Sequence, residues 1–493
     1  MSNQKKPILR LKGYEVVPPD EDRLVDVGVY DALLPCRKFE ISYRVAVLGN
    51  VSPSLEFLLR LVKAVPGISV EEAAAFFGYS QKEMEYVLEE AREPAYVALD
   101  QERLRLTIAG EQLFKDSGNE PLIYSVENRR RSYGFDLLSV APQRPISLDP
   151  AEFDLPELPI EDPSSTGNVA NRLSNQFRRF FHELSDKKDR EQVQRQDLYS
   201  IDNIAAKERF QIPVRIVARA QASSPHLIEE VDLTGWRPDH ELVDRREVER
   251  AASLFLELTK SSTNQLKSED GYRALVELAP DFLKEYSLRD GLSVRRYWRE
   301  AVGRTGEVRS DRKTIALVGN LTLQSNIEKL SSVLEYGQRD KQEIPRIIIS
   351  VTPQIAHWAA TTYYRDLLSL VRKKIERDDV DTERIKAIGL THGKPARYLQ
   401  RMLDSVASSD QSAFPPALEL FFVPQTFVAA LVHAPIGATN GYPVPLGFAS
   451  FDDAVLSRTN AFVLDQLGRF DMNDALYNEL AGTLADAPTE TKG

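Results

Sequence analysis

Apolar residues recur at helical spacing in several segments of the first quarter of the chain. Over residues 53–65, leucines and a valine stand three or four positions apart, which predicts an amphipathic helix. Two more helices are predicted to begin at Ser69 and Ser80, because each serine is followed three residues later by a glutamate, as in a capping box. From residue 96 the apolar positions alternate, which predicts a two-stranded hairpin over residues 96–106.

These three helices, the hairpin and a short closing helix at residues 107–114 resemble a winged helix-turn-helix. The resemblance implies a DNA-reading module in which Arg103 and Arg105, two positions apart, share one face of the wing and contact phosphates. The third helix, however, carries four glutamates between residues 83 and 90, which is unfavourable beside a phosphate backbone. Dimerisation or docking of another protein is therefore the alternative use of this module.

Two neighbouring segments flank this module. Residues 38–48 alternate apolar and polar positions and predict a strand with one buried face. Residues 121–147 are expected to form a pair of strands around three successive arginines, Arg129, Arg130 and Arg131. Arginines followed by aromatic residues suggest a nucleic-acid phosphate patch, and the alternative is a solvated turn.

Residues 147–167 contain prolines and acidic residues with little periodicity, which predicts a stiff linker. An amphipathic helix with a basic outer face is expected over residues 168–196. The predicted fold class is therefore multidomain, α+β and α/β. Its segments are an N-terminal module at 1–146, the linker at 147–167, a middle region of helices and strands at 168–312, an α/β domain at 313–470 and a tail at 471–493.

Within residues 313–467 the apolar pattern predicts the order β-α-β-α-β-α-β-β-β-α. Residues 346–352 form a continuous apolar run, typical of a strand buried on both faces. A helix is predicted over residues 395–406. The last two strands are expected to form a hairpin whose turn contains Asn440 and Gly441.

The end of this domain resembles the phospholipase D-like superfamily, whose H-x-K-x4-D-x6-G-S-x-N signature matches in interval from His433 to Ser450. The resemblance implies a phosphodiesterase half-site with His433 as the catalytic nucleophile, completed by a second half-site in a homodimer. Pro435, Asn440 and Phe448 replace the lysine, the aspartate and the serine of the signature. These departures predict that ordinary catalysis is lost. A hairpin that carries a histidine and a glycine at these places by chance is the alternative.

A second candidate site follows a predicted strand at His392, Lys394 and Arg397. Ligands of open α/β sheets bind beyond the carboxyl ends of the strands, and a helix N-terminus attracts anions. These residues therefore predict an anion-binding site. An ordinary strand-to-helix loop is the alternative.

Composition narrows the function classes. The chain has 493 residues, a formal net charge of −11 and one cysteine, which excludes a disulfide framework. It lacks a phosphate-binding P-loop motif, and its six histidines show no paired metal-binding spacing, so no cofactor and no metal are expected. With neither a signal sequence nor an apolar run of membrane-spanning length, a cytoplasmic protein without membrane contact is predicted.

We therefore expect a DNA-associated binding or scaffold protein, such as a component of a prokaryotic anti-phage defence or genome-maintenance system. DNA, a second copy of the chain and other proteins of the system are its expected partners. A ligand-sensing transcriptional regulator and a nuclease with a rebuilt histidine-dependent site are the alternatives.

Overall fold

The computed structural model describes residues 23–48, 52–115, 121, 124–160, 169–184, 196–233, 246–263, 268–289, 291–303, 306–339, 341, 345–376 and 385–485. The protein has mixed α and β structure and divides into two compact units. Unit 1 comprises Met1–Arg37, Asp136–Ser164 and Arg209–Gly493, and unit 2 comprises Lys38–Phe135 and Ser165–Glu208. None of the described helices is both long and apolar enough to cross a bilayer.

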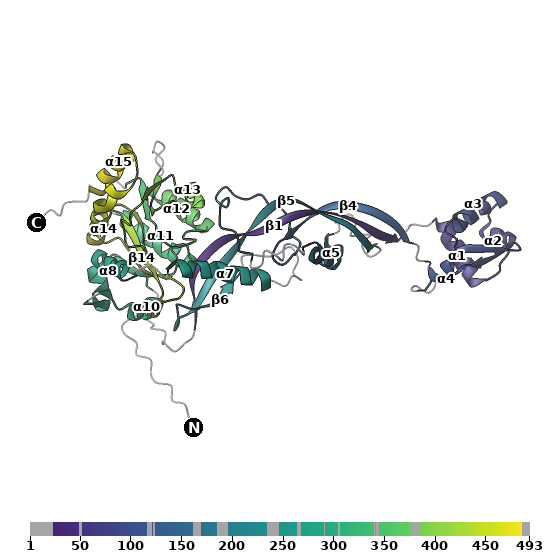
Figure 1. The fold of residues 1–493 in the computed structure, drawn as a ribbon, viewed down its shortest axis with the longest axis horizontal. Coiled ribbons are helices and arrows are strands. Elements are labelled where there is room, and N and C mark those ends of the chain that lie inside the picture. Colours follow the sequence, from purple (N-terminus) through teal and green to yellow (C-terminus); the bar gives the residue numbers. More distant parts are fainter. Residues whose placement is uncertain are drawn as a thin grey trace, which may run out of the picture. The chain divides into compact units, whose positions relative to one another are not determined.

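Unit 1 is built on a seven-stranded sheet in the order β12-β11-β10-β13-β14-β15-β9. Figure 1 shows strand β14 of this sheet among the helices of the unit. Strands β10, β11 and β12 pair in parallel, and all other neighbours in the sheet are antiparallel. Every residue of β10, β13, β14 and β15 is buried, so helices cover both faces. The strands are β9 (Thr314–Val318), β10 (Ile347–Val351), β11 (Lys386–His392), β12 (Ser405–Ser409), β13 (Leu418–Val423), β14 (Phe427–Ala434) and β15 (Val444–Ser450).

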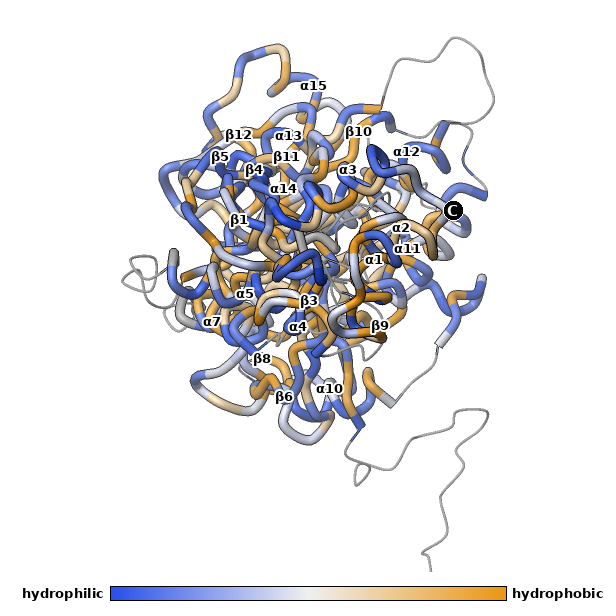
Figure 2. Tube along the Cα trace, turned by 90° about the vertical axis from the view of Figure 1, so that its right-hand side faces the viewer, coloured by the Kyte–Doolittle hydropathy of each residue, from blue (hydrophilic) through white to orange (hydrophobic). Residues whose placement is uncertain are grey.

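The two faces of this sheet belong to two apolar cores. Alternate residues of β14, such as Val432, pack with α8 (Ser268–Leu278) and α14 (Asp453–Gln466). The intervening residues, such as Leu431, pack with α11 (Gln324–Gln338), α12 (Thr362–Ile375) and α13 (Arg397–Met402). Most helices in Figure 2 carry both apolar and polar stretches, as expected of amphipathic helices packed on a core.

Other elements complete unit 1. A four-stranded sheet in the order β4-β1-β5-β6 has strands β1 and β5 with residues in both units. The remaining elements are β1 (Leu24–Leu48), β5 (Gln196–Gln221), β6 (Ile228–Asp232), α7 (Arg246–Thr263), α9 (Pro280–Leu283), the 3-10 helix η3 (Lys284–Tyr286), β7 (Ser287–Leu288), β8 (Gly291–Leu292), α10 (Val294–Gly303), the 3-10 helix η4 (Leu467–Arg469) and α15 (Asp474–Ala485).

Three expectations for unit 1 need correction. The helix predicted over residues 395–406 ends at Met402, and the polar, serine-rich segment after it forms strand β12. The supposed linker packs against the core over its first part, where Leu155 and Leu158 are buried. The supposed tail contains α15, which buries Leu480 against the rest of the unit. Residues 486–493 lie outside the described part of the chain.

In unit 2, residues 52–115 form a module with its own core. It contains α1 (Pro53–Ala64), α2 (Val70–Phe77), α3 (Gln81–Arg92), β2 (Val97–Asp100), β3 (Arg103–Leu106) and α4 (Ile108–Gln112). The predicted capping boxes at Ser69 and Ser80 are both confirmed. The hairpin turns at Gln101 and Glu102, which both have positive φ, as the tightest hairpin turns require.

The rest of unit 2 is β4 (Tyr124–Asp136), α5 (Val169–Leu184) and the unit's share of β1 and β5. The strand pair expected around the three arginines is wrong, because these residues lie within the single strand β4. The amphipathic helix is confirmed over α5, where Phe177 packs against Tyr43 and Tyr133. Residues 185–195, the expected end of that helix, lie outside the described part of the chain.

Candidate functional site

His433 lies near the end of β14, at the edge of the sheet where the parallel strands β10 and β11 have their carboxyl ends. Its residue surface is 5% exposed, and its backbone N–H donates to the Ala417 carbonyl at 2.9 Å. A histidine placed this deeply makes its contacts with protein groups and offers little surface to an external substrate.

The partner of this imidazole is Glu419 on the neighbouring strand β13. Nε2 of His433 lies 2.5 Å from Oε2 of Glu419, whose residue surface is 3% exposed. Burying a carboxylate costs several kcal/mol unless another group stabilises its charge. The histidine therefore serves Glu419 as a hydrogen-bond partner within the sheet.

Buried hydroxyl groups lie close enough to Glu419 for its charge to act on them. The hydroxyl of Tyr364 donates to Oγ of Ser350 at 2.7 Å, and those of Tyr30 and Tyr442 lie 2.6 Å apart. Burial raises the pKa of Tyr30 to about 12, and the charge of Glu419 adds to the rise. Burial also raises the pKa of Tyr364, again with a contribution from Glu419. At neutral pH both phenols stay protonated, and the hydroxyl of Tyr364 can donate to Ser350.

Strand β1 covers the edge of the sheet at which these groups lie. The Asn320 N–H, just after β9, donates to the Val27 carbonyl, and the Asp31 N–H donates to the Ala360 carbonyl at 2.7 Å. The Asp31 carboxylate, itself 3% exposed, accepts hydrogen bonds from Arg215 on β5 and from the backbone and hydroxyl of Thr362 at the start of α12. Because β13, β14 and β15 lie between β10 and β9 in the sheet, these bonds hold β1 across the end of β14 that carries His433.

The other positions of the histidine motif are not gathered around His433. Pro435 follows the strand, and Asn440 is exposed in the connection between β14 and β15. Phe448 packs into the core on the opposite face of the sheet. Ser450 pairs with Val428, five residues along β14 from His433, which is about 17 Å at ~3.3 Å per residue. Oγ of Ser450 bonds to Oγ1 of Thr314 at 2.8 Å and so has a structural partner.

The second predicted site, at His392, Lys394 and Arg397, lies at the carboxyl end of β11, where all three side chains are exposed. Helix α13 has only six residues, and its N-cap Ala396 offers no side-chain hydrogen bond. The hollow beside His392 has a volume of about 10 Å³, roughly that of one water molecule. Among the residues described, no group of three acidic, histidine or cysteine side chains is placed to hold a metal ion.

The arginines predicted to bind nucleic acid have protein partners in four of the five cases. Arg103 donates to the Gly67 carbonyl at 3.0 Å within the module. On β4, Arg129 pairs with Glu127 at 3.0 Å and Arg130 with Glu40. Arg131 also has a partner of its own. Arg105 is exposed on β3, where it lines a groove.

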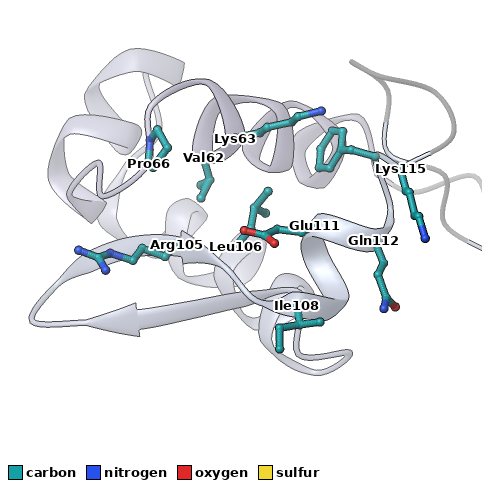
Figure 3. Close-up of a pocket in the computed structure, with 10 residues that line it drawn as sticks. Val62, Lys63, Pro66, Arg105, Leu106, Ile108, Glu111, Gln112 and Lys115 are labelled. Carbon is teal, nitrogen blue, oxygen red and sulfur yellow. The ribbon is translucent and has the colours of Figure 1, made fainter.

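This feature, here called the hairpin groove, has a volume of about 690 Å³ and runs between α1, β3 and α4 (Figure 3). Its lining residues are Val62, Lys63, Pro66, Arg105, Leu106, Ile108, Glu111, Gln112, Phe114 and Lys115. Ile108 at the groove is 78% exposed, and Phe57, Val65, Phe76 and Tyr86 are exposed elsewhere in the module. The size lies within the usual range of ligand sites, roughly 300–1,000 Å³.

No protein family model, no curated protein and no solved structure matches this chain. Its function is therefore inferred from its own residues. Sequence reasoning did not find Glu419 or the hairpin groove. A glutamate inside the apolar run of residues 417–423 was an available signal, because a charged residue in a buried strand needs a partner. The groove had no such signal, since its walls come from three separate elements.

Proposed function

We propose that this protein is a non-enzymatic binding protein, in which unit 1 is a scaffold and the module at residues 52–115 contacts a partner. The observation that carries the proposal is the burial of His433 against Glu419 beneath β1. A histidine nucleophile must reach a phosphorus atom and needs a cation beside it to neutralise phosphate charge. Pro435 occupies the position expected for that cation.

Within this proposal, unit 1 derives from a phospholipase D-like fold that lost its catalytic residues. Support comes from the order of elements from β9 to α14, in which strands and helices alternate before the antiparallel strands β13, β14 and β15. The module at 52–115 is proposed to be a winged helix, supported by three helices followed by a hairpin. A place in a prokaryotic defence or genome-maintenance system stays an expectation by analogy.

A protein is the first candidate partner, and DNA is the second. Residues 52–115 contain seven lysines and arginines against eleven aspartates and glutamates, a net charge of −4. The exposed side of α3 includes Glu85, Glu89 and Glu90, which would face phosphates in a major-groove complex. The exposed Arg105 is the observation that favours DNA.

Two alternatives have less support. A ligand-sensing regulator needs a cavity in the α/β unit, and the hollow beside His392 holds about one water. A nuclease would have to open β1 away from the sheet, breaking the contacts of Asp31 with Arg215 and α12.

The test is a phosphodiesterase assay with an activated phosphodiester and with single- and double-stranded DNA, using the wild-type chain and His433→Gln. We expect no turnover by either protein above a no-protein blank. Turnover by the wild type that disappears in a folded His433→Gln protein would show that the chain is an enzyme. Duplex DNA binding is measured in parallel over a salt series, because phosphate contacts weaken steeply with salt.

A further inference from the structure

The hairpin groove combines an apolar floor with a positive rim. Val62 and Phe114, both nearly buried, form part of the floor, while Ile108 stands at the edge with most of its surface in contact with solvent. A concave surface of this size is the usual setting of a binding site, and Ile108 adds exposed apolar surface at its edge. The floor can therefore accept apolar side chains from a partner.

The rim has the opposite charge to the rest of the module. Lys63, Arg105 and Lys115 line the groove with a single acidic residue, Glu111, although the module as a whole has a net charge of −4. Figure 3 shows these cations on α1, on β3 and after α4, around the groove. A concentration of positive charge beside apolar surface fits a partner that carries both carboxylates and apolar side chains.

Nucleic acid fits this surface less well. Single-stranded nucleic acids bind by stacking their bases on aromatic side chains. Phe114 is the aromatic residue of the groove lining, and the ammonium group of Lys63 lies 4.2 Å from its ring centroid. That ring face is therefore occupied by a cation. Duplex DNA would also approach the glutamates of α3.

Resting on the proposed binding function, we propose that the hairpin groove binds a peptide segment of a partner protein in which apolar side chains are flanked by aspartates or glutamates. The apolar side chains would lie on Leu106 and Ile108. The carboxylates would face Arg105 and Lys115.

The test is selection of a random peptide library displayed on phage against the immobilised full-length protein. We expect the enriched peptides to share apolar residues flanked by acidic ones. A fluorescein-labelled copy of the most enriched peptide is then titrated by fluorescence anisotropy. Ile108→Ser and Arg105→Glu should each weaken its binding roughly tenfold, which corresponds to about 1.4 kcal/mol.

Matched control variants carry the same changes outside the groove. Tyr86→Ser removes an apolar side chain that is 64% exposed on α3, and Lys82→Glu reverses an exposed charge on the same helix. Both should bind the peptide as the wild type does. Circular dichroism of all four variants checks that the fold is kept.

The proposal is overturned if no peptide is enriched, if the enriched peptides are basic, or if the groove variants bind as well as the controls. It is also overturned if labelled duplex DNA, rather than peptide, loses affinity in Arg105→Glu. Phosphodiester turnover by the wild type would instead refute the non-enzymatic function, whatever the selection yields, so the two failures are distinguishable.

Discussion

The pair formed by His433 and Glu419 allows a test that separates a structural histidine from a catalytic one. Both residues are almost fully buried, and Nε2 and Oε2 lie 2.5 Å apart. His433→Leu would leave a carboxylate buried without its partner, which costs about 3–5 kcal/mol. Glu419→Leu would leave an imidazole that can stay neutral, so its cost should be lower, about 1–3 kcal/mol.

The double variant carries the decisive expectation. Replacing both members of a buried pair with apolar residues of similar size is often close to neutral. The combined His433→Leu and Glu419→Leu protein should therefore lie within about 1 kcal/mol of the wild type. The loss in the double variant should be smaller than the sum of the two single losses by at least ~3 kcal/mol. A double-mutant cycle measures this difference as the interaction energy of the pair.

The measurement is urea unfolding followed by tryptophan fluorescence. All three tryptophans of the chain, at positions 236, 298 and 358, belong to unit 1, so the signal reports on the unit that holds the pair. With an m-value of about 2–3 kcal/mol per molar urea, a loss of ~3–5 kcal/mol moves the midpoint of His433→Leu down by roughly 1–2.5 M.

Single-variant costs below about 1 kcal/mol, or strictly additive losses in the double variant, would refute the structural role.

Three further predictions concern other buried groups. Burial lowers the pKa of His357, which stacks on Phe255, to about 4. Its neutral form therefore stabilises the fold above pH 6.5, and this contribution of about 3 kcal/mol is lost as the pH falls towards 4. The urea midpoint of His357→Asn should vary less with pH over this range than that of the wild type, and equal variation would contradict the prediction. Asp31→Ala leaves Arg215 and the start of α12 without their buried carboxylate, so the free energy of unfolding should fall by about 3–5 kcal/mol in the same fluorescence assay. A change under about 1 kcal/mol would show that other contacts hold β1. Gly110→Ala would place Cβ 2.2 Å from the Tyr96 carbonyl oxygen and should destabilise residues 52–115 by about 1–3 kcal/mol. The backbone amides of this module should then exchange hydrogen faster than in the wild type, and unchanged exchange would contradict the clash.

The sequence by itself determined the elements whose causes are local. The capping boxes at Ser69 and Ser80 place the starts of α2 and α3, because each serine and its glutamate lie within one turn of the helix that they cap. The apolar run of residues 346–352 likewise predicts β10, a strand whose residues are all buried. Such features depend on neighbours close in sequence, so they can be identified without the rest of the fold.

Only the tertiary structure decided how distant residues meet. The register of β13 against β14 brings Glu419 beside His433, and the same hairpin places Ser450 opposite Val428, away from the histidine. The motif spacing along the chain contains no information on register, since one shift in pairing changes every partner. Strand β12 was missed for a related reason, because its serine-rich sequence becomes a strand through pairing with β11. The covering of His433 by β1 depends on contacts between residues several hundred positions apart, which no local pattern encodes.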